Sequence, residues 1–362
     1  MLHWTNALTG LGDGAIIAGV ALGLVLAYQG SGVINFAHGA MMMYSTYLYD
    51  ELRDTGDLVF PLSIGSDRVN LLGTPADGEL TAFWPAFLVA LAVAALLGLA
   101  VHLFVFEPLR GSPVLAKVVA TVGILIVLQS IVLLRFGTQT ETVGAVLPND
   151  AVDLAGVRVP EDRLWLALIV LVTAALLMAL YRFTRFGLAT RAAAEQEKGA
   201  QLLGYSPAVL AAGNWMLASV TAAAFGILAA SIGGGVNSVN YTLLVVPAIA
   251  AALIGGLRSF FVTAVACLAL GMLRSELTFL QVQSWWPEFA RTGMCDVVPF
   301  VLIVIALFVR GHRLPTRGAI DEGRQAFAPT PRRVGPATVT LVALGLVAIV
   351  VFDRALRLSL YQ

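Results

Sequence analysis

Long apolar runs with few charges are the feature that most limits what this chain can fold into. A helix needs about 20 mostly apolar residues to cross a bilayer. Only 12% of the 362 residues are charged, whereas about a quarter are charged in a typical soluble domain. The sequence therefore predicts an all-α polytopic membrane protein with about 8–10 transmembrane helices. The runs lie near residues 11–29, 32–49, 82–106, 114–136, 164–182, 209–231, 241–257, 259–275, 295–310 and 334–352.

The charges of the connecting segments predict the orientation of these helices. Segments 50–81 and 137–163 are rich in Asp and Glu. Segments 107–117, 182–208 and 310–333 carry an excess of Lys and Arg. Because Lys and Arg mark the cytoplasmic side of a membrane protein, we expect the acidic segments to face outward and the basic segments inward.

The motifs of a nucleotide site or a metal centre are missing from the sequence. A phosphate-binding loop requires Gly-Lys-Ser/Thr, and neither Lys117 nor Lys198 lies in that context. The histidines are scattered, and Cys267 and Cys295 provide no metal or disulfide framework. We therefore predict that this chain has no catalytic residue, no metal and no cofactor, and is not an enzyme. Its formal net charge of zero gives no reason to expect nucleic acid as a partner.

Carboxylates are scarce within the apolar runs, where ion-coupled transporters usually place them. Glu107 lies at a cytoplasmic end and Asp296 at an outer end. This scarcity argues against secondary active transport. It favours a pore-forming subunit whose energy comes from another protein.

A polar pair interrupts the second apolar run, in the stretch SGVINFAHGAMMMYSTYLY at residues 31–49. Asn35 and His38 are three positions apart, so on a helix they would share a face. One interpretation is that this face, continued by Tyr44, lines a translocation path. The other is that both polar side chains form hydrogen bonds to neighbouring helices, as is common in membrane bundles.

Glycines mark two further positions of structural interest. Gly32 and Gly39 flank the polar pair and would permit either a close helix approach or a break before the span. Runs 241–257 and 259–275 are separated only by GLRS, which predicts a tight helical hairpin.

The basic segment contains a short helix that is not a span. Residues 191–203 are mostly good helix formers, and Gly204 is placed to end the helix as a C′ glycine. Arg191 and Glu195 lie on its charged edge. Such a helix could dock in a groove on a cytosolic partner or lie on the membrane surface as a connector.

Four stretches resemble one known family. GVINFAHGAMMMYSTY (32–47), EPLRGSPVLAKVVATVGILIVLQ (107–129), RAAAEQEKGAQLLGYSP (191–207) and AAALIGGLRSF (250–260) are similar to the permease subunits of bacterial branched-chain amino acid ABC importers. The family also includes urea and short-amide permeases. The resemblance runs in order across residues 10–310.

The resemblance implies an ABC importer permease bundle over residues 1–310, with a cytoplasmic coupling helix, in a bacterial inner or plasma membrane. It also implies a second permease subunit, two cytosolic subunits that use ATP, and an extracytoplasmic solute-binding protein, besides the surrounding lipid. Asn35 and His38 match the signature of the second span. The residues that match the coupling pattern are Arg191, Ala192, Glu195, Ala200 and Gly204. The matching structural glycines are Gly32, Gly39, Gly255 and Gly256.

The expected function is that of a transmembrane permease subunit in an importer for branched-chain or other small amino acids. The alternatives are a urea or short-amide permease, a stand-alone channel or facilitator for a small neutral solute, and a membrane-embedded enzyme or scaffold. Residues 311–333 are expected to form a cytoplasmic basic linker. Residues 334–362 are expected to add a transmembrane helix, either as a terminal addition or as the start of a fused or truncated second permease half.

Overall fold

The computed structural model describes residues 2–58, 69–73, 80–154, 157–232, 235–283, 285–288, 291 and 293–310. The expected linker at 311–333 and the expected added helix at 334–362 lie outside these residues. The helices are α1 (Leu2–Ser31), α2 (His38–Asp54), α3 (Phe83–Val101) with a π-helical turn η1 (His102–Phe106), α4 (Val114–Phe136), α5 (Glu161–Phe183), α6 (Arg185–Glu195), α7 (Glu197–Leu202), α8 (Pro207–Ala229), α9 (Ser238–Leu243), α10 (Val245–Ile254), α11 (Phe260–Gln281) and α12 (Met294–Arg310).

Two small antiparallel hairpins complete the described structure. Strand β1 (Asp57–Leu58) pairs with β2 (Val69–Asn70), and β3 (Ala151–Leu154) pairs with β4 (Val157–Pro160). Both hairpins belong to the segments predicted to face outward. The prediction of an all-α polytopic membrane protein is therefore confirmed for the spanning part of the chain.

Six of the described helices are long and apolar enough to cross a membrane. They are Thr5–Ser31, Phe83–Phe106, Val114–Phe136, Glu161–Phe183, Pro207–Ala229 and Phe260–Gln281. Two shorter apolar segments, Ser238–Ile254 and Met294–Val309, add to the bundle.

The expected second span, 32–49, differs most from the structure. The chain makes a non-helical connection after α1, and α2 begins only at His38. The expected span at 241–257 is divided at Leu244 into α9 and α10. Both interruptions shorten apolar runs that the sequence alone presents as continuous.

Helix α1 is the central element of the bundle and packs along α8, α11, α5 and α10. Of the residues in its most apolar 18-residue stretch, 89% are buried inside the structure, compared with 17% for the corresponding stretch of α4. Glycines bring it close to its neighbours: a Cβ at Gly14 would lie 2.7 Å from the Leu268 Cα of α11, and one at Gly19 would lie 2.2 Å from the Phe225 Cβ of α8. Helices α3, α4 and α12 instead expose large apolar side chains, as expected for surfaces that meet lipid or another subunit.

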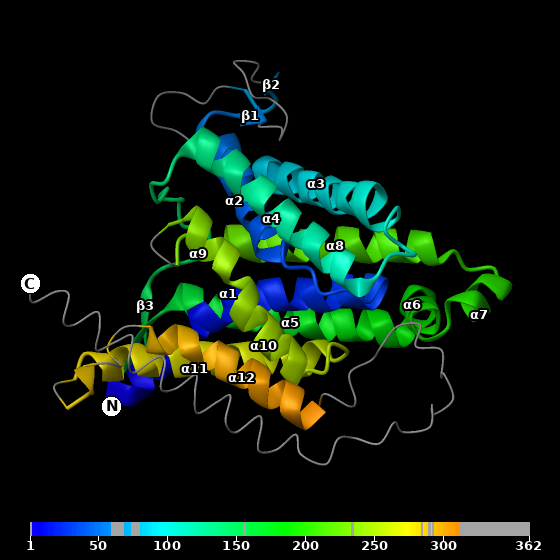
Figure 1. The fold of residues 1–362 in the computed structure, drawn as a ribbon. Coiled ribbons are helices and arrows are strands. Elements are labelled where there is room, and N and C mark those ends of the chain that lie inside the picture. Colours follow the sequence, from blue (N-terminus) through cyan, green and yellow to red (C-terminus); the bar gives the residue numbers. More distant parts are fainter. Residues whose placement is uncertain are drawn as a thin grey trace, which may run out of the picture. The chain divides into compact units, whose positions relative to one another are not determined.

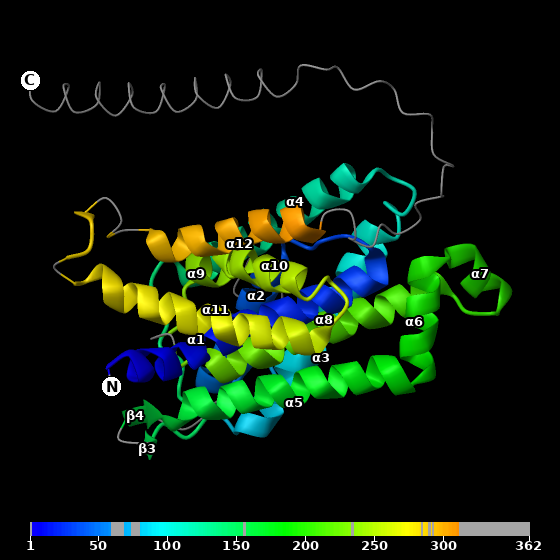
Figure 2. The same cartoon turned by 90° about the horizontal axis from the view of Figure 1, so that it is seen from below.

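The two ends of the bundle carry the segments that the charge pattern separates. In Figures 1 and 2, α6 and α7 lie at one end, whereas the N-terminus and the β3–β4 hairpin lie at the opposite end. We call these the inner and outer ends, following the predicted orientation.

The predicted helical hairpin at GLRS is confirmed. Helix α10 ends at Ile254, the turn contains Gly256 with φ +67° and Leu257 with φ +56°, and α11 begins at Phe260. The Ser259 hydroxyl caps α11 by accepting a hydrogen bond from the Val262 amide at 3.3 Å. A Cβ at Gly255 would lie 2.1 Å from Thr263 Oγ1, so this turn also requires a glycine for packing.

Candidate functional site

The predicted shared helix face of Asn35 and His38 is wrong. Asn35 precedes α2, because Gly32 has φ +72° and turns the chain out of the helical path after α1. The Asn35 side chain instead makes a local turn: its Oδ1 accepts a hydrogen bond from the Ala37 amide at 3.0 Å. Asn35 Nδ2 lies 3.5 Å from His38 Nδ1, so the two side chains meet through this turn.

His38 is completely buried at a three-helix junction. A Cβ at Gly23 of α1 would lie 2.0 Å from His38 Nε2 and 2.8 Å from the Ala218 carbonyl oxygen of α8. The imidazole thus fills the space that Gly23 leaves between α1, α2 and α8. Tyr44 is also buried, with 3% of its surface exposed.

Gly39 has a comparable packing role on the other side of α2. A Cβ there would lie 2.7 Å from the Thr242 carbonyl oxygen of α9. A side chain at this position would push the two helices apart. The role of Asn35, His38 and Tyr44 in lining a path remains a prediction.

The short cytoplasmic helix differs from the single element expected at 191–204. Helix α6 starts earlier, where the Thr184 hydroxyl accepts a hydrogen bond from the Gly187 amide at 3.2 Å. It ends at Glu195, because Gln196 has an extended backbone with φ −145° and ψ 97°. Helix α7 then starts at Glu197, so two helices meet at an elbow.

The predicted end of this element at Gly204 is confirmed. Gly204 has φ +84°, a conformation that costs little only for glycine. Its amide donates to the Gln201 carbonyl at 2.9 Å, and the Tyr205 amide donates to the Ala200 carbonyl at 3.0 Å. These bonds satisfy carbonyls at the end of α7.

The α6–α7 elbow projects from the inner end of the bundle (Figure 2). Of the predicted coupling residues, Arg191 and Glu195 are exposed, Ala192 is half-buried and Ala200 is buried. The end of α7 also exposes two leucines, Leu202 at 89% and Leu203 at 75%.

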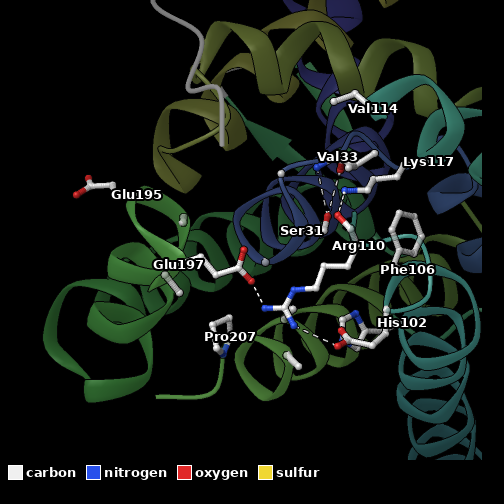
Figure 3. A pocket seen from close by; sticks show the side chains of 17 residues that line it. Ser31, Val33, His102, Phe106, Arg110, Val114, Lys117, Glu195, Glu197 and Pro207 are labelled. Carbon is white, nitrogen blue, oxygen red and sulfur yellow. Dashed lines mark hydrogen bonds and ion pairs between the residues drawn. The ribbon is translucent and has the colours of Figure 1, made fainter. Parts of the chain in front are cut away.

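A cavity of about 280 Å³ lies beside this elbow and is called the inner cavity (Figure 3). It lies among the C-terminal end of α1, η1, the α3–α4 connection, the two elbow helices and the start of α8. Its lining residues are Gly30, Ser31, Gly32, Val33, His102, Phe106, Glu107, Arg110, Val114, Lys117, Ala193, Ala194, Glu195, Glu197, Pro207, Ala208 and Ala211.

Arg110 occupies the middle of the inner cavity. Its guanidinium pairs with Glu107 at 3.2 Å and with Glu197 at the start of α7. Lys117 Nζ donates to the Arg110 carbonyl at 3.0 Å. Figure 3 shows Arg110 between Glu197 and the His102 side of the cavity. Arg110 therefore links the elbow to the turn that follows η1.

An acidic group with an altered pKa lies at the outer end. Burial, followed by the carboxylates of Asp54, Glu141 and Glu51, raises the pKa of Asp50 to about 7. Arg135 Nη2 lies 3.9 Å from Glu51 Oε1, so one cation partly compensates this acidic region.

Two charged residues inside the spans were not singled out by the sequence analysis. Asp13 lies in α1 and Arg274 in α11, and both line a second cavity in the outer half of the bundle. Their placement within otherwise apolar runs was the signal that could have identified them, because ionisable residues at such positions are usually functional. Within the described part of the chain, no group of three or more His, Cys, Asp or Glu side chains is arranged to hold a metal ion.

Comparison with known proteins gives a consistent result. The family model described as branched-chain amino acid transport system / permease component matches residues 6–307. The chain is 26% identical over 328 residues to the high-affinity branched-chain amino acid transport system permease protein BraD of Pseudomonas aeruginosa, which covers 88% of this chain and 98% of that protein. It is 25% identical over 315 residues to the high-affinity branched-chain amino acid transport system permease protein LivH of Escherichia coli K12. This match covers 85% of this chain and 94% of that protein.

A third relative, LivH of Salmonella typhimurium, is 24% identical over 315 residues, with 85% of this chain and 94% of that protein covered. No solved structure matches the chain.

Proposed function

Because the chain belongs to the family of branched-chain amino acid transport permease components, we propose that it is the membrane-spanning subunit of an ATP-driven importer in a bacterial inner membrane. Its solutes are branched-chain or other small amino acids, delivered by an extracytoplasmic binding protein. The family is one of transport permeases and not of enzymes. On this proposal the subunit makes and breaks no covalent bond, and ATP is used by partner subunits.

The exposed elbow is the observation that carries the coupling role. Leu202 and Leu203 are exposed at the end of α7, and the charged side chains of Arg191 and Glu195 are exposed on α6. A short helix with exposed apolar anchors and a charged edge suits a groove on another protein. We assign that groove to a cytosolic ATP-binding subunit, with two such subunits serving this chain and a second permease subunit.

The contacts of Arg110 provide a route by which the elbow can move the bundle. Glu197 of α7 pairs with Arg110, which lies in the turn that follows η1. Within η1, the Phe106 ring packs on Trp215 of α8 with centroids 4.4 Å apart. A displacement of the elbow would therefore act on α3 and α8 together, as rigid elements in contact transmit motion. The π-helical turn is a frequent feature of functional regions.

A reconstituted importer tests this proposal. The chain is co-expressed with its neighbouring permease, ATPase and binding-protein genes, purified as a complex and placed in proteoliposomes. Combined Leu202→Ala and Leu203→Ala substitutions should reduce ATPase co-purification and solute-stimulated ATP hydrolysis about tenfold or more, since buried apolar anchors dominate such interfaces. The matched control is Leu134→Ala, which removes a leucine that is 83% exposed on α4.

The control should behave as wild type in both measurements. Normal complex assembly and normal ATP-driven uptake by the Leu202→Ala/Leu203→Ala variant would contradict the docking role. Uptake that proceeds without ATP would support a channel or facilitator, and uptake of urea or a short amide in preference to leucine would support the other permease type.

A further inference from the structure

A cavity of about 540 Å³ lies in the outer half of the bundle and is called the outer cavity. It is lined by residues of α1, α9, α10, α11 and α12, and Leu244, at the division between α9 and α10, contributes to its wall. Its volume falls within the roughly 300–1,000 Å³ that is typical of small-molecule sites.

Asp13 supplies a carboxylate to this cavity from an otherwise uncharged span. It is the one charged residue in the sequence from Thr5 to Ser31. Asp13 is exposed and lines the outer cavity. A charged group is costly within a bilayer, so such residues face a water-filled cavity or the bundle interior and mark solute pathways. Asp13 forms no ion pair with any described residue.

Arg274 of α11 supplies a cation to the same cavity. Its Nη2 lies 3.3 Å from Asp296 Oδ1, while the Asp296 side chain is 76% exposed and that of Arg274 is 26% exposed. A guanidinium has five N–H donors, and this single contact leaves donors that a second carboxylate could engage in a bidentate arrangement. Arg163 of α5 acts electrostatically on Asp13, and Arg274 does so more weakly.

The remaining wall is largely apolar. Leu243, Leu244, Val246, Pro247 and Phe300 line it from α9, α10 and α12. The outer cavity thus combines the carboxylates of Asp13 and Asp296, the Arg274 guanidinium and an aliphatic surface, and of the two carboxylates only Asp296 is paired with Arg274. An α-amino acid with an apolar side chain has the complementary set: an ammonium, a carboxylate and a hydrocarbon group.

We infer that the outer cavity binds the translocated amino acid as a zwitterion, with its ammonium at Asp13, its carboxylate at Arg274 and its side chain against the apolar wall. This inference rests on the proposed function. It places solute recognition in the permease itself, inside one subunit, in addition to recognition by the external binding protein.

The chain carries a native reporter for this site. Its two cysteines are Cys267, which is completely buried, and Cys295, which is partly exposed and lines the outer cavity. Cys295 Sγ lies 3.3 Å from Thr278 Oγ1, another lining residue. Solute in the cavity should therefore shield Cys295 from a small water-soluble thiol reagent.

The experiment measures the rate of Cys295 modification by a methanethiosulfonate reagent in the assembled importer. Mass spectrometry of the peptide containing Cys295 separates its labelling from that of other subunits. Leucine should slow modification at least fivefold. Of two leucine analogues, 4-methylpentanoate lacks the ammonium group and 3-methylbutylamine lacks the carboxylate. At the same concentration, each should protect Cys295 from modification at least tenfold more weakly than leucine. The analogue series uses the unaltered chain, so it stays informative if a variant fails to fold.

Substitutions then assign the two charges. Asp13→Asn and Arg274→Gln should each abolish protection by leucine. The matched control is Asp153→Asn with Arg158→Gln, because this pair, 3.8 Å apart, lies exposed on the outer β3–β4 hairpin and away from the cavity. The control should retain full protection.

Two outcomes would overturn the inference while leaving the proposed function intact. One is normal ATP-driven leucine uptake in the same proteoliposomes with no effect of leucine on Cys295. The other is equal protection of Cys295 by leucine and by both analogues. Failure of the unaltered importer to take up any amino acid would instead refute the proposed function itself.

Discussion

Replacing Gly23 tests whether His38 is a packing residue between helices. A Cβ at Gly23 would lie 2.0 Å from His38 Nε2 and 2.8 Å from the backbone oxygen of Ala218. An ordinary van der Waals contact is more than 3.4 Å, so the buried imidazole must move by more than 1 Å or α1 must separate from α8. Overpacking of this kind costs about 1–3 kcal/mol, and we expect Gly23→Ala to lie near the upper end.

The assay is thermal unfolding of the purified protein in detergent, with Gly123→Ala as the matched control. Gly123 lies within α4, and a Cβ there meets no atom within 4 Å. One kcal/mol corresponds to a shift in Tm of roughly 2–4 °C for a mid-sized domain. Gly23→Ala should therefore lower the Tm by several degrees, whereas the control should leave it unchanged or raise it slightly.

A double-mutant cycle sharpens this prediction. His38→Ala should destabilise the protein alone, because it leaves a cavity at the junction. Combined with Gly23→Ala, it should be less destabilising than the sum of the two single changes, since the new methyl group then enters the vacated space. Strict additivity, or an unaltered Tm for Gly23→Ala, would refute the packing role of His38.

The other predictions concern the inner and outer ends. Arg110→Ala should lower solute-stimulated ATP hydrolysis and solute uptake together while leaving complex assembly intact. Exchanging the charges of Arg110 and Glu197 should restore much of the hydrolysis and the uptake. No rescue by this exchange would contradict the role of the Arg110–Glu197 pair in linking the elbow to the bundle. Because the folded-state pKa of Asp50 is about 7 and its unfolded value is about 3.9, the folded protein binds more protons between these values. Its contribution to stability therefore falls as pH rises from about 4 to 7 and is level above that. The Tm measured across this range should show a shallower decline for Asp50→Asn than for wild type, and identical slopes would contradict the assignment.

Local features of the fold could be predicted from the sequence because each depends on neighbouring residues. Gly204 ends α7 in the left-handed conformation that its position suggested, and GLRS forms the tight turn between α10 and α11. The separation of acidic and basic segments to opposite ends follows equally from composition. In each case a few adjacent residues determine the outcome.

Features that depend on tertiary packing were harder to predict from the sequence. The Gln196 elbow interrupts a stretch whose residue types are compatible with a continuous helix. Before α2, Gly32 was compatible with either a break or a close helix approach, and the sequence alone did not decide between the two. Arg110 and Glu197 are 87 positions apart in the sequence, and no local pattern pairs them. Asp13 and Arg274 share a cavity because α1 packs against α11.

The most direct test of the central claim is the energy requirement for solute movement by the complete importer. Proteoliposomes containing the purified complex are loaded with or without ATP, and labelled leucine is supplied outside with the binding protein. We expect leucine to accumulate above its external concentration only with ATP inside and binding protein outside. Equilibration of leucine across the membrane without ATP, at the same rate as with it, would contradict the claim that this chain is the permease of an ATP-driven importer.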